Sequence, residues 1–276
     1  FKQKTAYEIR LSLVGSEMCI RDRYNPKDTT YTTVPSKRAI TIRDLLTHTS
    51  GIDYAQIGSP EAQAIYAKHN ITAGLDVSGD KLSDAMNRLG SLPLSHQPGE
   101  KWTYGLNIDL LGYLVEIWSG MSLDEFFNTR IFSPLGMKDT YFNVPEEKAN
   151  RLVNFFMEDS TGLKKYEKAV GGDMNFPLRK KSYFSGGGGL SSTIFDYAIF
   201  LQMMLNNGEY NGQRLLSRNT VRMMTMNQIG DLNLGENKFG LGFAIVSEKG
   251  SSIPVSYTHL RAHETKANLV CRLLLE

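Results

Sequence analysis

One tyrosine in this chain stands where a phenol could act as an acid or a base. The segment WTYGLNIDLLG, Trp102 to Gly112, places Tyr104 directly before a helical pattern of apolar residues. A phenol near a cationic lysine can have a pKa low enough to accept a proton from a serine hydroxyl. An aromatic residue before a helix can equally be a core or staple residue, so spacing alone leaves both roles open for Tyr104.

A serine nucleophile would complete such a site, and the chain contains one Ser-x-x-Lys match, Ser78-Gly79-Asp80-Lys81. At a helix start this spacing brings the lysine amine beside the serine hydroxyl. Here the glycine and the aspartate indicate a polar loop, and Ser78 and Asp80 are suited to cap the apolar helix pattern that follows. We therefore expect Ser78 to be a loop residue and not the nucleophile.

Other chemistries have weaker support in the sequence. No Gly-x-Ser-x-Gly elbow occurs, which counts against an α/β-hydrolase. The run Gly186 to Gly189 lacks the Gly-Lys-Ser/Thr ending of a phosphate loop. His48, His69 and His96 lack metal-ligand spacing, and the position of His48 in an HTSG turn favours a structural hydrogen bond.

The elements that must position Tyr104 are mostly helical. Helix starts are predicted at capping residues, and stops at glycines or before Pro134. One strand is predicted over Phe239 to Val246, between glycine-rich flanks, and its partner strands are expected outside the central segment. The predicted caps are Thr41 with Asp44, Asn107, Ser122 with Glu125, Thr193 with Asp196, and Ser217.

The two ends of the chain are related to each other through their codons. A DNA sequence that encodes residues 1–7 has a reverse complement that encodes residues 270–276, and the relation continues inward to Arg23 and Pro254. An evolved protein has no reason to end in an antisense copy of its beginning. We therefore interpret residues 1–23 and 254–276 as translated sequencing-adapter sequence, and residues 24–253 as a partial domain.

Setting the ends aside changes the charge balance. The whole chain has 31 Lys/Arg, 29 Asp/Glu and a net charge of +2, whereas residues 24–253 have 23 and 24, a net of −1. Nothing in this balance favours nucleic acid or an anionic membrane as a partner. Both cysteines, Cys19 and Cys271, lie in the ends, so the central segment has no disulfide framework, Cys nucleophile or thiolate metal site.

Four blocks of the central segment resemble the β-lactamase-related serine hydrolases, in the order of that family. They are ITIRDLLTHTSGI (40–52), the run from Pro98 to Phe127, IFSPLGMKDTYF (131–142) and the run from Phe184 to Asn206. The family includes class C β-lactamases, family VIII carboxylesterases and penicillin-binding D,D-peptidases. The resemblance implies an α+β fold of the β-lactamase/penicillin-binding-protein type, with a nearly complete helical lobe and a truncated antiparallel sheet lobe.

The resemblance also implies roles for individual residues. Tyr104 takes the place of the second-motif tyrosine and is the implied proton acceptor and donor. Many members have an asparagine two residues after this tyrosine, where this chain has Leu106; Asn107 comes one place later, a register closer to the esterase-like members. Substrate-binding roles are expected for Asn107, Gly187 and Gly188. The nucleophilic Ser-x-x-Lys is expected upstream of residue 24, and the third motif after residue 253.

The implied reaction is acyl transfer through an acyl-enzyme, on esters, β-lactams or D-amino-acid peptides, with no metal or organic cofactor. The chain as printed is expected to be inactive because its Ser-x-x-Lys segment is missing. The alternative is a non-catalytic binding protein on the same fold. We expect small-molecule partners, no nucleic acid and no membrane segment; the location is unknown, and a periplasmic or extracellular parent is compatible with the resemblance.

Overall fold

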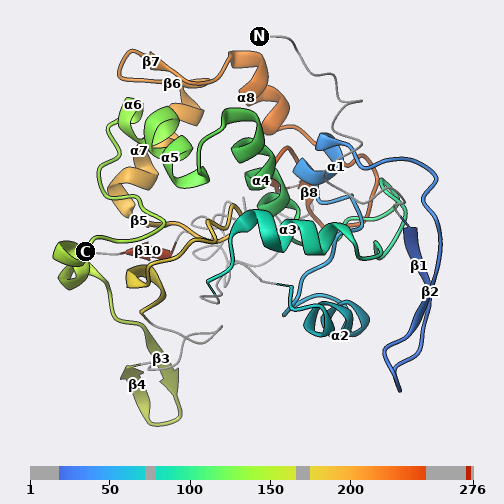
Figure 1. Ribbon diagram of the computed structural model, residues 1–276. Helices are drawn as coiled ribbons and strands as arrows, with labels where there is room; N and C mark the ends of the chain where they lie inside the picture. Colours follow the sequence, from blue (N-terminus) through green and yellow to red (C-terminus); the bar gives the residue numbers. More distant parts are fainter. Residues whose placement is uncertain (1–18, 72–78, 166–174, 247–271, 275–276) are drawn as a thin grey trace.

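Helices dominate the computed structural model, which describes residues 19–71, 79–165, 175–246 and 272–274 (Figure 1). The helices of its first half are α1 (Ile42–Leu46), α2 (Pro60–Lys68), α3 (Leu82–Gly90), α4 (Asn107–Ser119) and α5 (Leu123–Phe127). A π-helical turn η2 (Asn128–Phe132), α6 (Ser133–Leu135), α7 (Ile194–Leu205) and α8 (Arg218–Met224) follow, with short 3₁₀ turns η3 (Glu146–Arg151) and η4 (Phe176–Leu178) between α6 and α7.

The strands are short and paired two by two within the described residues. The antiparallel pairs are β1 (Cys19–Tyr24) with β2 (Tyr31–Pro35), β3 (Phe156–Asp159) with β4 (Gly162–Lys165), β6 (Glu209–Tyr210) with β7 (Gln213–Arg214), and β8 (Lys238–Phe239) with β9 (Ala244–Ile245). Strand β5 (Ser191–Thr193) pairs in parallel with β10 (Arg272–Leu274). This mixture of helices and small sheets confirms the predicted α+β class.

Helix α4 is the central element, in contact with α1, α3 and α5 (Figure 1). Its buried residues Leu110 and Leu114 share one apolar core with Leu82 of α3 and Leu123 of α5. A Cβ atom at Gly112 would lie 2.8 Å from the Leu123 Cδ2 atom, so the glycine lets α5 approach α4 closely. The first turn of α4, which follows Tyr104, is thus anchored by packing on several sides.

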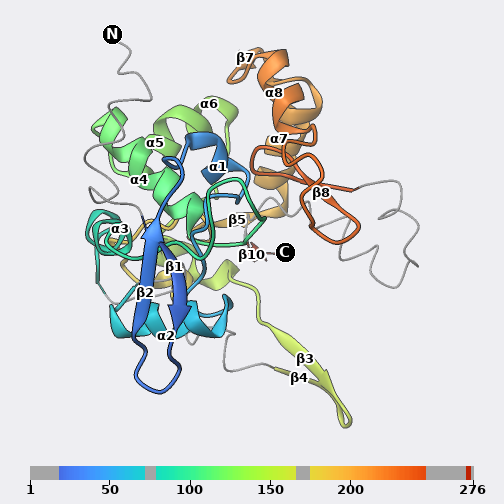
Figure 2. The same ribbon diagram turned by 90° about the vertical axis from the view of Figure 1, so that its right-hand side faces the viewer.

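A second apolar cluster joins the end of the α5–α6 segment to α7 and α8. It contains Phe132, Leu135, Met203, Met204 and Val221. Figures 1 and 2 show α7 and α8 beside each other, away from α2 and the β1–β2 hairpin. In both views the β3–β4 hairpin projects from the rest of the structure.

Most of the predicted caps are confirmed. Thr41 and Asp44 form a capping box at α1, and Ser122, Thr193 and Ser217 each accept a backbone N–H at the start of their helices.

Two predicted caps are wrong. Helix α4 begins after Leu106, so Asn107 is its first residue and not its cap. Helix α3 begins after Lys81, which makes no side-chain capping bond, and the Asp80 carboxylate instead pairs with Arg88. Ser78 lies outside the described residues.

The helix expected to stop before Pro134 continues past it. The path from α5 passes through η2 into α6, where Pro134 occupies the first turn, and it ends at Gly136 with a φ of 76°. A proline is tolerated in a first helical turn because the missing N–H has no intrahelical partner there. The prediction failed because a π-turn restarts the helix just before the proline.

The single strand predicted over Phe239 to Val246 is also wrong. Residues 240–243 turn the chain back, and β8 and β9 pair with each other as a hairpin. Gly242 has a φ of 79°, a value that glycine adopts without strain, and the backbone N–H of Gly240 donates to the carbonyl of Phe243 at 2.7 Å. Gly240 and Gly242, which lie inside the predicted strand, are therefore residues of the hairpin turn.

Residues from both predicted adapter ends occupy places in the structure. In β1 the Ile20 side chain is 6% exposed and joins the main core, and the Arg21 N–H donates to the carbonyl of Leu94 at 2.9 Å. Strand β10 belongs to the other end. These placements concern packing and leave the origin of the ends as a prediction.

Candidate active site

Tyr104 lies in a cluster of aromatic rings just before α4. Its ring stacks with Tyr54 at a centroid distance of 5.5 Å and with His48 at 5.1 Å. Trp102 is a third neighbour at 6.4 Å, and Phe239 of β8 contacts both Trp102 and His48. Offset and edge-to-face arrangements at these separations are favourable, so the plane of the phenol is well defined.

The environment keeps this phenol protonated at neutral pH. Burial raises the pKa of Tyr104 to about 12, and the negative charge of Asp109 acts in the same direction. A base role for the phenol therefore requires a cation close enough to reverse this shift. Such a cation would have to offset the unfavourable carboxylate as well as the burial.

His48 holds the segment that carries Tyr104. The His48 side chain is fully buried, and its carbonyl accepts the Thr103 N–H at 2.8 Å. The Nδ1 atom lies 3.0 Å from the Asn107 Nδ2 atom and 3.4 Å from the Gly105 backbone nitrogen. Burial lowers the pKa of His48 to about 3, so the imidazole is neutral. The structural hydrogen-bonding role predicted for His48 agrees with these contacts.

Asn107 points into the protein. It is 0% exposed, and its Oδ1 atom accepts a hydrogen bond from the Ser50 hydroxyl while its amide nitrogen meets His48. Because Leu106 is the N-cap of α4, the Asn107 side chain makes these contacts instead of capping the helix. The substrate contact expected for Asn107 remains a prediction, and the contacts that the structure records are internal.

Asp109 is a buried carboxylate that the sequence reasoning missed. It is 1% exposed in the first turn of α4, and burial raises its pKa although hydrogen bonds with Ser185 and the backbone of Gly187 act against the rise. Among the described residues its Oδ1 atom has no hydrogen-bond partner. The available sequence signal was an acidic residue between Ile108 and Leu110, inside an apolar helix pattern.

The glycine run packs against the same turn of α4. A Cβ atom at Gly186 would lie 2.5 Å from the Ile108 carbonyl oxygen, and one at Gly187 would lie 3.0 Å from the Asp109 Oδ2 atom. The Gly188 N–H donates to the Ser185 hydroxyl at 3.1 Å. The structure thus brings Gly187 to the buried carboxylate that follows Tyr104. The substrate-binding roles of Gly187 and Gly188 stay predictions.

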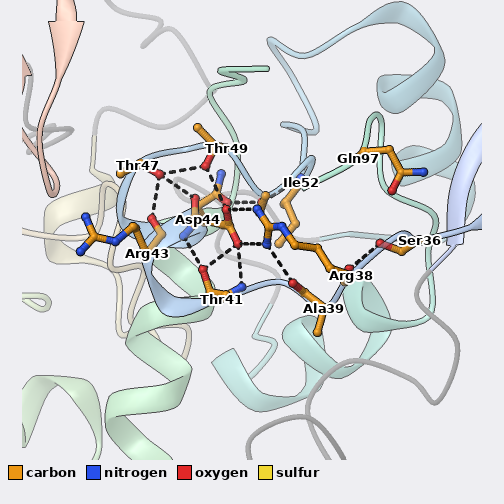
Figure 3. A network of polar contacts seen from close by, with 12 residues as sticks. Ser36, Arg38, Ala39, Thr41, Arg43, Asp44, Thr47, Thr49, Ile52 and Gln97 are labelled. Carbon is orange, nitrogen blue, oxygen red and sulfur yellow. Dashed lines mark hydrogen bonds and ion pairs between the residues drawn. The ribbon is translucent and has the colours of Figure 1, made fainter. Parts of the chain in front are cut away.

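A polar network supports the turn that contains His48 (Figure 3). Arg38 donates to the Asp44 carboxylate through its two terminal guanidinium nitrogens, at 2.6 and 2.8 Å, and Thr41 and Thr49 add hydrogen bonds to the same group. Burial alone would raise the pKa of Asp44, but the bonds from Arg38 and Thr41 outweigh it and lower the pKa. The charged aspartate therefore ties α1 to the start of the turn.

In the described part of the chain, no group of three or more His, Cys, Asp or Glu residues could hold a metal ion. No described helix combines the length and apolar character needed to cross a membrane.

The comparison with known families decides the membership of the chain. The sequence model of the Beta-lactamase family matches residues 22–266. The chain belongs to the Beta-lactamase family. The resemblance to this family is therefore confirmed, and the fold is of the β-lactamase/penicillin-binding-protein type.

Individual relatives of this family match at moderate identity. An uncharacterized protein of Mycobacterium tuberculosis is 32% identical over 253 residues, covering 87% of this chain and 60% of that protein. Lovastatin esterase of Penicillium rubens is 35% identical over 177 residues, covering 63% of this chain and 41% of the esterase. The chain thus spans 60% or less of the length of these two relatives.

A solved structure supports the fold. EstCE1, described as a hydrolase with promiscuous acyltransferase activity, matches with a TM-score of 0.64 and 23% identity, covering 78% of this chain and 58% of EstCE1. At this identity the match bears on the fold alone.

Proposed function

We propose that the protein containing residues 24–253 is a serine-type acyl hydrolase in which Tyr104 relays a proton. The observation that carries this proposal is the position of Tyr104 in a stacked ring cluster before α4. Its segment also resembles the second-motif tyrosine block of the family to which the chain belongs. Attack by a serine on an acyl carbon would form an acyl-enzyme, and water would release it. The phenolic oxygen would accept the serine proton and pass it to the leaving group.

The environment of Tyr104 sets a requirement for this role. A phenol with a pKa of about 12 is a poor base at neutral pH unless an ammonium group stabilises the phenolate. We propose that the lysine of a Ser-x-x-Lys motif supplies that charge. The single Ser-x-x-Lys match in the chain, Ser78 to Lys81, is not assigned this role; Lys81 is the N-cap of α3, and Ser78 lies outside the described residues.

We propose carboxylic esters as the substrate class. The support is the similarity to lovastatin esterase, together with the esterase-like register of Asn107 after Tyr104. β-Lactams and D-amino-acid peptides are the competing substrates within the same chemistry.

The test is ester hydrolysis by the full-length protein with short-chain p-nitrophenyl esters. Tyr104→Phe should lower kcat/KM on the order of 100-fold or more, because it removes the proton-transfer group and keeps the ring. Tyr54→Phe is the matched control, since it removes a neighbouring phenol of the same stack and should have a much smaller effect. Full activity of Tyr104→Phe would show the assigned role to be wrong. A full-length protein that neither hydrolyses esters, lactams and peptides nor reacts with a fluorophosphonate probe would be a binding protein.

The chain as printed gives a second, independent test. We propose that it is inactive, so a fluorophosphonate serine probe should leave it unlabelled. Labelling at Ser78 would contradict both the inactivity and the assignment of Ser78 to a loop.

A further inference from the structure

His48 has an unusual combination of backbone conformation, burial and contacts. Its φ of 57° lies in the left-handed region, which a non-glycine residue adopts only at a cost. Its side chain is 0% exposed although imidazole is polar. The fold tolerates this conformation and burial in a residue whose ring stacks on Tyr104 at 5.1 Å and 25°.

The contacts of Nδ1 fix where the imidazole carries its proton. The Gly105 backbone N–H can only donate, and it points to Nδ1 at 3.4 Å. The Asn107 amide nitrogen is also a donor, at 3.0 Å from the same atom, and its orientation is set by the Ser50 hydroxyl that donates to Oδ1. Nδ1 is therefore the acceptor, and the proton of the neutral ring resides on Nε2.

These contacts hold both sides of Tyr104 along the chain. Thr103, the residue before it, donates its N–H to the carbonyl of His48 at 2.8 Å, and Gly105, the residue after it, donates to the imidazole. Gly105 packs closely against the backbone of Ile52, since a Cβ atom there would lie 2.1 Å from the Ile52 carbonyl oxygen. One residue thus holds the backbone on either side of Tyr104 and contacts its ring.

We propose that His48 is a positioning residue for Tyr104: a neutral Nε2–H imidazole whose Nδ1 acceptor holds the backbone around the phenol and whose ring holds the phenol plane. The inference rests on the function proposed for Tyr104 only in its consequence for catalysis. The geometric part stands on the contacts alone.

The first test needs no substitution. Nitrogen-15 NMR of the histidine side chains in the full chain should show His48 as the neutral Nε2–H tautomer at neutral pH, with Nδ1 in the acceptor range. A His48 spectrum of the Nδ1–H tautomer, or of a ring averaging between tautomers, would overturn the proposal.

Two substitutions separate the acceptor from the ring. His48→Asn keeps an acceptor and a residue that tolerates the left-handed backbone but removes the stacked ring. His48→Phe keeps a ring and leaves two buried donors without their acceptor. The pKa of Tyr104 is measured from the phenolate absorbance, as the difference between each protein and its Tyr104→Phe counterpart. In His48→Asn this pKa should fall by on the order of one pH unit, because the lost packing admits water. The matched control His69→Asn, at an exposed histidine, should leave the titration unchanged.

In the full-length protein, His48→Asn should lower kcat on the order of 10- to 100-fold with little change in KM, because a displaced phenol affects the chemical step. An unchanged Tyr104 titration in folded His48→Asn and His48→Phe would overturn the positioning role. If Tyr104→Phe keeps its activity while the titration still shifts, the proposed function fails and the positioning role survives.

Discussion

At the residue scale, the phenol of Tyr104 is surrounded by groups that all resist charge. Burial and the carboxylate of Asp109 each disfavour the phenolate, and the neutral His48 supplies no positive charge to stabilise it. These residues therefore fix the position of the phenol. They do not make it a base, which would need a nearby cation.

The charge of Asp109 can be removed while the shape of the side chain is kept. Asp109→Asn should lower the pKa of Tyr104 below its value of about 12, because the repulsion between the carboxylate and the phenolate disappears. The measurement is a spectrophotometric titration corrected with Tyr104→Phe, and Glu125→Gln on exposed α5 surface is the control. A Tyr104 pKa that stays the same or rises in Asp109→Asn would contradict the placement of the carboxylate.

His48 should make the protein sensitive to acid. Its pKa is about 3 when folded against 6.5 for an ordinary histidine, so between these values the unfolded chain binds a proton that the folded chain does not. The free energy of unfolding therefore rises with pH across this window. The contribution of His48, on the order of a few kcal/mol, is complete above about pH 6.5 and is lost as the pH falls toward about 3. Urea unfolding at about pH 4 and about pH 7 measures this loss.

The same experiment on His48→Asn isolates the histidine. The pKa of His96 is also lowered by burial, and the raised pKa of Asp109 acts with the opposite sign. The difference between the wild type and His48→Asn should therefore depend on pH even if the total does not. Equal pH dependence of the two proteins would mean that His48 is not held neutral by the fold.

At the residue scale, the sequence indicated Tyr104 as a candidate site residue but did not predict which residues surround it. Tyr104 could be picked out because it precedes a helix in a block that resembles a known family. Tyr54 reaches the phenol only through folding, and no local pattern marks it. Asp109 was marked only as an acidic residue inside the apolar pattern of α4. The capping role predicted for Asn107 was wrong because the helix begins one residue earlier than expected. An asparagine at the cap and one in the first helical position cannot be told apart from the sequence alone.

At the element scale, the β1–β2 hairpin offers a matched pair. Ile20 and Val34 lie opposite each other, with exposed fractions of 6% and 38%. Ile20→Ala should lower the free energy of unfolding by about 2–4 kcal/mol, because it leaves a cavity in the core. Val34→Ala should cost within about 0.5 kcal/mol. Equal effects in chemical denaturation would contradict the placement of β1.

Alanine substitutions in the run Gly186 to Gly189 should destabilise the protein to different degrees, according to how closely each glycine packs against the first turn of α4. Gly186→Ala should destabilise the protein by about 1–3 kcal/mol, because its methyl group would meet the Ile108 backbone oxygen at 2.5 Å. Gly187→Ala should cost less, since its neighbour at 3.0 Å is the Asp109 side chain, which can shift. Thermal unfolding of the two variants gives the order, and the reverse order would show that the run approaches α4 differently.

Helix starts were predictable because capping is local, whereas helix stops and turns were not. Thr41, Ser122, Thr193 and Ser217 each satisfy a backbone donor within three residues, so sequence contains the whole interaction. The passage through Pro134 depends on a π-turn, which has no comparable signature.

At the scale of the whole molecule, α7 exposes large apolar side chains at both of its ends. Phe195 is 66% exposed and Leu205 77%, whereas Met203 and Met204 on the same helix are buried in the second cluster. Exposed apolar area of this kind promotes self-association.

The chain should therefore associate as its concentration rises. Phe195→Glu and Leu205→Glu should each reduce light scattering and the binding of a hydrophobic dye. Gln202→Glu is the control, because it adds a charge to an exposed position of α7 and removes no apolar surface. Equal improvement by Gln202→Glu would mean that net charge, and not the exposed apolar side chains, governs the association.

The fold class was predictable at this scale because four ordered blocks define the family even where single elements are misassigned. The error over Phe239 to Val246 was to predict one strand where residues 240–243 reverse the chain and β8 pairs with β9. The β-favouring residues on both sides of the turn fit either arrangement.

The chain contains two tryptophans, and their positions provide an intrinsic fluorescence probe of the ring cluster. Trp102 lies within the ring cluster, 5.8 Å from His48 and 6.4 Å from Tyr104, and its indole N–H is buried without a described hydrogen-bond partner. Trp118 is 43% exposed near the far end of α4. Dissolved iodide should quench the emission of Trp118 first, leaving a shorter-wavelength signal that reports on the surroundings of the phenol. With Trp118→Phe, a fluorimeter alone could follow how that cluster responds to acid, to heat or to an added ester.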